Sequence, residues 1–173
     1  MDEWDRFEIG AHMARRVFFS FHYERDIWRV NQVRNHWITK PGSEDAGYWD
    51  AGLWEEAKKK GEEAINRMID RALENTSVTV VLIGAQTSER QYVKYEIEQS
   101  YTRGNGLLGV YIHNLKDRNQ LTDARGPNPF ELFTVNANGQ TLSQRVKTYD
   151  WVNDRGYEGF SDWVEKAARD AGR

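Results

Sequence analysis

The stretch "SVTVVLIGAQTSERQYVKYEIEQSY" (Ser77–Tyr101) contains the two patterns that decide the fold. Residues 78–84 form a short, continuous apolar run rich in valine, which is typical of a strand buried on both faces of a parallel sheet. After a polar loop, Val93, Ile97 and Tyr101 recur every four residues, which predicts a helix that packs this stripe on the sheet. A strand, a loop and a helix in this order are the parts of a βαβ unit.

The same alternation continues along the chain. Further strands are predicted at residues 15–21, 107–113 and 145–151, and helices at 24–37, 53–75 and 160–171. A long loop is predicted at 39–52. Irregular structure with room for a short helix is predicted at 114–144. Ser88 is expected to cap the helix of the opening stretch, with Gln91 completing a capping box. The pattern predicts an α/β fold, a flavodoxin-like three-layer sandwich around a mostly parallel sheet. Functional groups are then expected in the loops after Phe21, Gly84 and His113, at the carboxyl ends of strands.

Composition excludes several classes of function. The 173 residues suit one domain, and 24 basic against 27 acidic residues give a net charge of -3, which does not suggest a nucleic-acid partner. The chain has no cysteine and four scattered histidines, so a metal site is not predicted. No apolar run is long enough to span a bilayer and no signal peptide is recognisable, so we expect no membrane association and a cytoplasmic location. Residues 1–12 are either a native acidic extension or a cloning-derived segment, and the domain is expected to span residues 13–173.

The loops exclude the better-known cofactor sites of such folds. The loop "FHYERD" (Phe21–Asp26) has no glycine, whereas a dinucleotide-binding unit needs G-x-G-x-x-G there. His22 and Tyr23 are too bulky for a flavin phosphate cradle, and "VLIGAQ" (Val81–Gln86) lacks the aspartate of a phospho-receiver. No P-loop or H-E-x-x-H motif occurs. We therefore predict that no metal, flavin or other prosthetic group is needed.

Several motifs together resemble a known family. "RRVFFSFHYERD" (Arg15–Asp26) resembles the opening strand and first loop of TIR domains, and "SERQYVKYEIEQS" (Ser88–Ser100) resembles their helix that carries a catalytic glutamate four residues after an aromatic residue. "DAGLWEEAKKKG", "GPNPF" and "YDWVNDRGYEGFSDWV" resemble one branch, the ThsB proteins of the Thoeris anti-phage system. The resemblance runs from Arg15 to Trp163. The chain departs from it at Tyr92, where enzymatic TIR domains often have tryptophan, and in a shorter stretch between "GPNPF" and "YDWV".

This resemblance implies chemistry on NAD+. It implies cleavage of the bond between nicotinamide and ribose, and transfer of the ADP-ribosyl group onto itself to give a cyclic ADP-ribose isomer. The product would activate a separate ThsA-type effector after an unidentified phage trigger, and self-association is compatible with the family. Two alternatives stay open: a non-catalytic TIR-type assembly module, and a degenerate receiver or flavin binder.

The resemblance implies that Glu96 is the catalytic residue. On the helical wheel, Lys94 and Glu98 point outward, whereas Glu96 lies at the edge of the buried stripe, with Tyr92 one turn before it. Departure of nicotinamide leaves positive charge on the ribose, which a carboxylate stabilises. A glutamate has an unperturbed pKa of about 4.3, so it is anionic at neutral pH unless it is buried alone.

The other candidate residues surround this glutamate in the expected fold. Each also has a structural alternative as core, loop or helix-surface residue. The candidates for substrate binding are Phe19, Ser20, His22, Tyr23, Asp50 and Tyr92.

Overall fold

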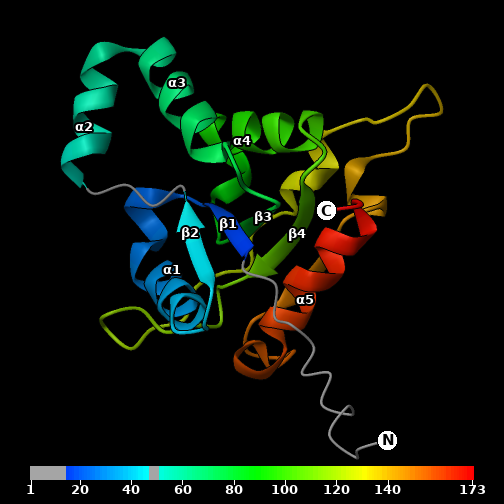
Figure 1. Ribbon diagram of the computed structural model, residues 1–173. Helices are drawn as coiled ribbons and strands as arrows, with labels where there is room; N and C mark the ends of the chain where they lie inside the picture. The colour runs from blue at the N-terminus through cyan, green and yellow to red at the C-terminus, as the bar shows by residue number, and fades with distance from the viewer. Residues whose placement is uncertain (1–14, 47–50) are drawn as a thin grey trace, which may run out of the picture.

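The centre of the molecule is one sheet of five parallel strands (Figure 1). The computed structural model describes residues 15–46 and 51–173. The strands are β1 (Arg15–Ser20), β2 (Ser43–Ala46), β3 (Val78–Ile83), β4 (Gly106–Tyr111) and β5 (Lys147–Asp150). Their order in the sheet is β2-β1-β3-β4-β5, and every neighbouring pair is parallel. The prediction of an α/β fold with a parallel sheet is therefore confirmed.

Helices cover both faces of the sheet and complete three layers. The α-helices are α1 (Tyr23–Ile38), α2 (Ala51–Lys60), α3 (Glu62–Leu73), α4 (Gln91–Thr102) and α5 (Gly156–Asp170). Three short 3-10 helices lie in the connections: η1 (Thr87–Glu89), η2 (Pro129–Leu132) and η3 (Leu142–Gln144). α1 and α5 pack on one face, α3 and α4 on the other, and α2 packs against α3 (Figure 1).

The alternation of side chains along β1 places a polar residue under α4. Val17, Phe19 and Phe21 belong to the core beneath α1 and α5, whereas Phe18 belongs to the core beneath α2 and α3. Successive residues of a strand point to opposite faces, so Ser20 shares the face of Phe18. Ser20 is fully buried there, at the carboxyl end of the strand.

Three sequence predictions of local structure were wrong. The predicted loop 39–52 contains the edge strand β2, and the helix predicted for 53–75 is broken at Gly61, whose φ of +96° interrupts it. Ser88 does not cap α4, because the helix begins at Gln91 after Arg90 and has no side-chain cap. Residues 87–89 instead form η1, where the Thr87 hydroxyl accepts a hydrogen bond from Gly84 N at 2.8 Å.

The expected boundary at residue 13 lies outside the described residues. Within the described part of the chain, no helix has the length and apolar character needed to cross a membrane. A cytoplasmic location stays a prediction.

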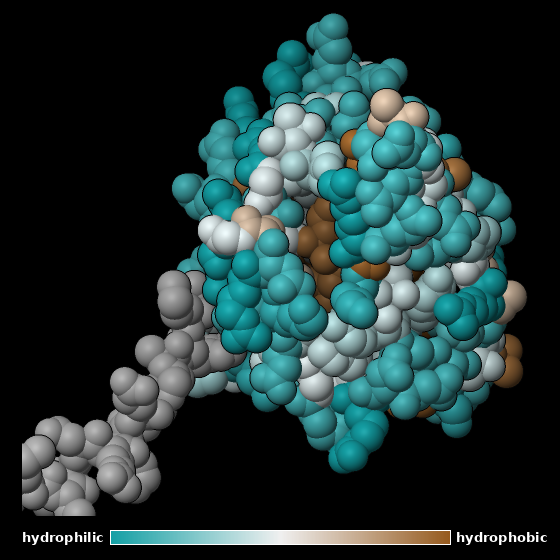
Figure 2. All heavy atoms as spheres, turned by 90° about the vertical axis from the view of Figure 1, so that its right-hand side faces the viewer, coloured by the Kyte–Doolittle hydropathy of each residue, from teal (hydrophilic) through white to brown (hydrophobic). Residues whose placement is uncertain are grey.

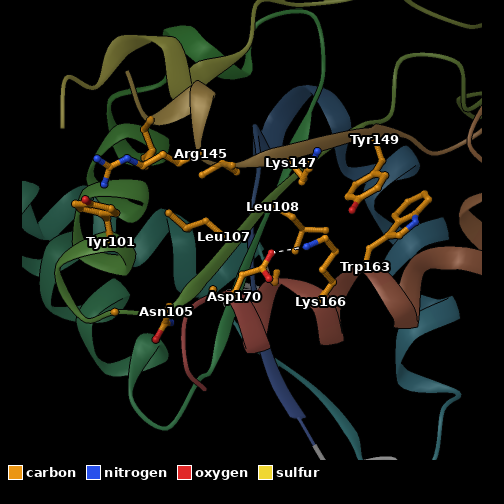
Figure 3. Close-up of a pocket in the computed structure, with 16 residues that line it drawn as sticks. Tyr101, Asn105, Leu107, Leu108, Arg145, Lys147, Tyr149, Trp163, Lys166 and Asp170 are labelled. Carbon is orange, nitrogen blue, oxygen red and sulfur yellow. Dashed lines mark hydrogen bonds and ion pairs between the residues drawn. The ribbon is translucent and has the colours of Figure 1, made fainter. Parts of the chain in front are cut away.

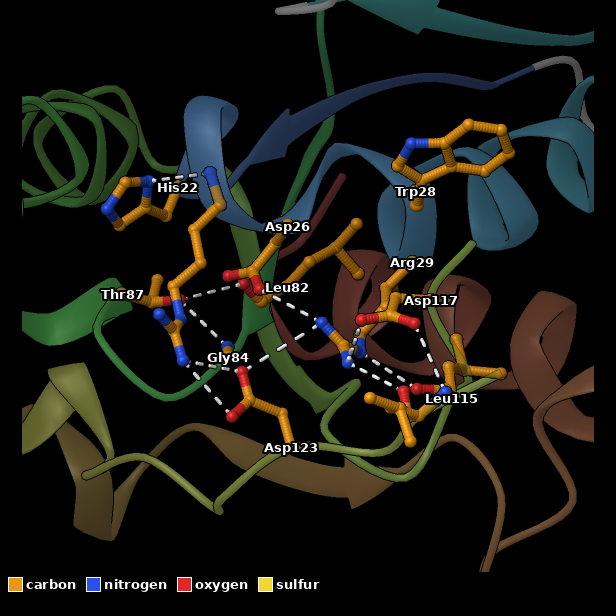
Figure 4. A network of polar contacts seen from close by, with 12 residues as sticks. His22, Asp26, Trp28, Arg29, Leu82, Gly84, Thr87, Leu115, Asp117 and Asp123 are labelled. Carbon is orange, nitrogen blue, oxygen red and sulfur yellow. Dashed lines mark hydrogen bonds and ion pairs between the residues drawn. The ribbon is translucent and has the colours of Figure 1, made fainter. Parts of the chain in front are cut away.

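A polar network ties α1 to the loop that follows β4 (Figure 4). Arg29 is almost fully buried, and its guanidinium donates hydrogen bonds to the carbonyl oxygens of Leu115 at 2.8 Å and Leu121 at 2.9 Å. Arg25 binds both carboxylate oxygens of Asp123, at 2.9 and 3.1 Å. The network fixes the start of α1 relative to the carboxyl edge of the sheet.

Asp26, which lies beside this network, is a buried carboxyl without a hydrogen bond in the described part of the chain. Its side chain is 0% exposed, and neither carboxylate oxygen has a hydrogen-bond partner among the described residues. The nearest Arg29 nitrogen is 3.9 Å from Oδ1. A Cβ on Gly84 would lie 2.2 Å from Oδ2, so the carboxyl is packed directly against the end of β3. Burial raises the pKa of Asp26 to about 6, against the attraction of Arg29.

We predict that Asp26→Asn stabilises the protein above pH 6 and not near pH 4. Between the ordinary aspartate pKa of 3.8 and the folded pKa of about 6, the folded protein binds the extra proton, so wild-type stability falls as pH rises. The difference in the free energy of unfolding between variant and wild type should grow across this window by on the order of 3 kcal/mol. Urea unfolding at pH 4, 5, 6 and 7.5 measures it. If the difference in the free energy of unfolding did not change with pH, the raised pKa of Asp26 would be contradicted.

Candidate functional site

The side chains of Glu96 and Ser20 meet in the interior of the protein. Glu96 lies in the middle of α4 and is 5% exposed. Its Oε2 atom accepts a short hydrogen bond from the hydroxyl of Ser20 at the end of β1. Val93 and Ile97 pack into the core and Glu98 is exposed, so the predicted helix phase holds around Glu96. The prediction for Tyr101 was wrong, because this side chain is 44% exposed near the end of α4.

A small cavity beside Glu96 is walled mainly by aromatic rings. Its volume is about 20 Å³. It is lined by Phe19, Phe21, Tyr23, Trp54, Arg90, Tyr92, Val93 and Glu96. Trp54 meets Tyr92 edge to face, with ring centroids 5.3 Å apart, and meets Tyr23 at 6.3 Å. A water needs roughly 10–15 Å³ of such space, so the cavity has room for about one water and none for a larger ligand.

The closed cavity changes the ionisation of Glu96. Burial raises the pKa of its carboxyl to about 8, and the hydrogen bond from Ser20 lowers it by a smaller amount. No cation is bonded to the carboxyl within the described residues. In this arrangement Glu96 is mostly protonated at neutral pH. Glu96 is thus the exception named above: a glutamate that is buried without a cation stays mostly neutral.

The structure brings most of the predicted site residues together. Ser20, Tyr23 and Tyr92 lie at the Glu96 cavity. Phe19 also borders it, although its ring stacks on Phe160 in the core at 6.3 Å.

His22 has a different place from the one expected. It caps α1, and its Nδ1 accepts a hydrogen bond from Arg25 N at 3.3 Å. It does not line the Glu96 cavity. Burial and the positive charge of Arg90 lower the pKa of His22. The candidate Asp50 lies outside the described residues.

Four residues that line the cavity were not among the candidates: Phe21 and Val93, which are apolar, and Trp54 and Arg90, which carry polar groups. Trp54, on α2, is 4% exposed, and its Nε1 donor has no hydrogen-bond partner in the described structure. Arg90, directly before α4, has a guanidinium without a hydrogen bond or ion pair in residues 15–46 and 51–173. Trp54 has no local sequence signal, because only the packing of α2 brings it here. Arg90 has one, since it directly precedes the helix of Glu96.

These groups form a site with a carboxyl, a wall of aromatic rings, a guanidinium and an indole N–H, the last two without partners in the described part of the chain. No cluster of three or more metal-ligating side chains occurs among the described residues. The chemistry that the side chains offer is stabilisation of positive charge by Glu96 next to rings that exclude water.

We predict that Ser20→Ala raises the pKa of Glu96 above its value in the wild type. The hydroxyl of Ser20 stabilises the carboxylate, and the variant removes this donor without opening the cavity to solvent. Carbon-13 NMR titration of the glutamate side chains measures the shift. Ser100→Ala is the matched control, because Ser100 is also buried on α4 but donates to the backbone carbonyl of Glu96 at 2.6 Å. An unchanged or lower pKa in Ser20→Ala would contradict this contact.

Comparison with known proteins identifies the family. Residues 18–117 match the family described as "Thoeris protein ThsB, TIR-like domain", which is more than half of the chain. A protein of Bacillus cereus (strain MSX-D12), named "Putative cyclic ADP-D-ribose synthase ThsB1", is 40% identical over 191 aligned positions, covering 88% of this chain and 100% of that protein. The alignment is longer than the 173 residues of this chain, so the relative has segments that this chain lacks. The chain belongs to the Thoeris ThsB family of TIR-like domain proteins.

Proposed function

We propose that this protein cleaves the bond between nicotinamide and ribose in NAD+ and closes the ADP-ribosyl group into a cyclic isomer. The observation that carries the proposal is the buried Glu96 carboxyl in a cavity walled by aromatic rings, in a chain that is similar to a protein named as a cyclic ADP-ribose synthase. The cyclic product is proposed to be a signal for a ThsA-type effector in anti-phage defence.

The reaction needs a negative charge beside the ribose carbon from which nicotinamide leaves. The C1′–N bond breaks, its electron pair leaves with the now neutral nicotinamide, and the ribose carbon becomes positively charged. An ionised Glu96 stabilises this charge as it develops. A hydroxyl oxygen of the same molecule then bonds to the carbon and passes its proton to the Glu96 carboxylate. No leaving-group acid is needed, because nicotinamide is already cationic when attached.

The substrate itself can ionise the site. Glu96 has a pKa of about 8 when the cavity is empty, because burial is not balanced by a cation. The pyridinium ring of NAD+ brings a positive charge to the carboxyl, and an opposite charge within a few ångströms favours the ionised form. Glu96 is therefore held mostly neutral without substrate and becomes anionic with it.

The wall of the cavity favours cyclisation over hydrolysis. A hydrolase needs a water beside the ribose carbon, whereas a cyclase must keep water out and admit another hydroxyl of the substrate. Tyr23, Trp54 and Tyr92 surround the approach to Glu96 with large rings. The unpartnered Nε1 of Trp54 and the free guanidinium of Arg90 offer donors for the substrate's hydroxyl and phosphate oxygens.

Substrate binding requires the cavity to widen. At about 20 Å³ it is far smaller than the roughly 300–1,000 Å³ of ordinary ligand pockets. The contact of Trp54 on α2 with Tyr92 on α4 closes it. We infer that substrate entry separates these two rings.

We predict that Glu96→Gln abolishes NAD+ turnover and leaves the fold intact. Glutamine keeps the size of the side chain and a hydrogen-bond acceptor for Ser20, but it cannot carry the negative charge. Nicotinamide release from NAD+ in the presence of infected-cell extract, followed by liquid chromatography, measures the activity. The loss should exceed tenfold, which corresponds to about 1.4 kcal/mol of the activation barrier.

Glu98→Gln is the matched control for this variant. Glu98 lies on the same helix and carries the same charge, but it is exposed. It should keep wild-type turnover. If Glu96→Gln retained activity within tenfold of wild type, Glu96 would not be the catalytic group. If the wild type released no nicotinamide with or without infected-cell extract, the chain would be a non-catalytic assembly module.

We predict that the main product is a cyclic ADP-ribose isomer and that linear ADP-ribose is minor. The cyclic product has the mass of NAD+ less nicotinamide, and the linear product has one water more. Mass spectrometry of the reaction mixture distinguishes them. Predominantly linear product from an active sample would make the protein a simple NAD+ hydrolase and would remove the case for a separate effector.

A further inference from the structure

A second hollow lies at the opposite end of the sheet from Glu96. It is formed by the ends of α4 and α5, the first residues of β4 and the segment leading into β5 (Figure 3). Its volume is about 280 Å³, close to the lower limit of about 300 Å³ for small-molecule sites. It shares no residue with the Glu96 cavity.

The hollow has an apolar floor. Figure 2 shows a narrow hydrophobic slot surrounded by hydrophilic surface on this side of the molecule. The apolar lining includes Leu107, Leu108, Leu142 and Val146. At one end, Tyr149 of β5 stacks flat on Trp163 of α5, with ring centroids 4.1 Å apart and planes 5° from parallel. A packed aromatic pair of this kind is a fixed wall for a flat apolar group.

The rim of the hollow is cationic. The basic residues that line it are Arg145, Lys147 and Lys166. Among the described residues, the lining contains one acidic side chain, Asp170. Asp170 is paired with Lys166 at 2.7 Å. Arg145 donates to the neutral amide oxygen of Gln140 at 3.0 Å, and the ammonium of Lys147 has no hydrogen bond or ion pair within the described residues. Two positive charges at the rim are therefore uncompensated, although the whole chain has a net charge of -3.

We propose that this hollow binds a mononucleotide, with the base on the apolar floor beside Tyr149 and Trp163 and the phosphate at the cationic rim that Arg145 and Lys147 form. An inorganic anion would leave the apolar floor uncovered, and an uncharged apolar ligand would leave the two cations unused. A ligand with both a flat base and a phosphate satisfies both parts. The volume of about 280 Å³ matches one nucleotide, and a dinucleotide would extend beyond the hollow.

The site is separate from the proposed reaction. Gly106–Leu108 begin β4, whereas Ser20 ends β1 at the other edge of the sheet, where it bonds Glu96. The family match ends at residue 117, before Arg145, Lys147 and the aromatic pair. Binding here can therefore be measured in a protein without turnover, and its result does not depend on whether NAD+ is cleaved.

Calorimetric titration with AMP tests the proposal. The wild type and Glu96→Gln should bind AMP equally, and both should bind adenosine or inorganic phosphate at least tenfold more weakly. The double variant Arg145→Glu/Lys147→Glu should bind AMP at least tenfold more weakly than wild type, after circular dichroism has verified its fold. The control Arg67→Glu changes the charge of an exposed residue on α3 and should bind like wild type. Equal affinity of the double variant, or equal binding of adenosine or phosphate, would overturn the proposal.

Chemical-shift mapping on the unmodified protein gives a second measurement that needs no variant. AMP should shift the amide signals of Leu107, Lys147 and Lys166 and leave those of Trp54 and Tyr92 in place. Shifts confined to Trp54 and Tyr92 would place the nucleotide at the Glu96 cavity and overturn the proposal. Absence of binding at millimolar AMP would also overturn it.

Discussion

The proposed function depends on the burial of one carboxyl. Glu96 points from α4 into a cavity of about 20 Å³, where the Ser20 hydroxyl is its hydrogen-bond donor and rings form most of the wall. Desolvation raises its pKa to about 8, so the carboxyl of the empty site is mostly protonated at neutral pH. In the proposed reaction, the positive charge of NAD+ would favour the ionised form of this carboxyl. The aromatic wall around it would keep water away from the ribose.

Sequence patterns predicted the fold where burial is strong and failed where it is weak. The apolar run of β3 and the stripe of Val93 and Ile97 on α4 are fully buried, and both elements were placed correctly. β2 was missed because its sequence "SEDA" carries no apolar alternation, since an edge strand is paired on one side only. Tyr101 was assigned to the core by its spacing, but the neighbouring Ser100 is the residue of this turn that is fully buried and contacts Thr79 of β3, whereas Tyr101 is 44% exposed and borders the second hollow.

The candidate site could be predicted only in part, for a related reason. Ser20, Tyr92 and Glu96 come from elements whose phase is fixed by strong periodicity, so their meeting at the carboxyl edge of the sheet could be anticipated. Trp54 sits on α2, and the position of this helix depends on packing against α3 and α4 that no local pattern contains. His22 was expected near the substrate, but its side chain accepts the hydrogen bond of the helix start, a role common to short polar residues before a helix.

Two buried acids at the same edge of the sheet show why burial alone does not identify a site. Asp26 and Glu96 both have pKa values raised by desolvation, and both lie near the carboxyl ends of strands. Asp26 is packed against Gly84 so closely that a Cβ would lie 2.2 Å from its oxygen, and no space remains for a ligand. Glu96 has a cavity beside it, a single donor at its oxygen, and two rings from different helices, Trp54 and Tyr92, whose separation would open it. Burial raises the pKa at both positions, but of the two acids only Glu96 borders a cavity, and for this reason the proposed reaction is placed at Glu96.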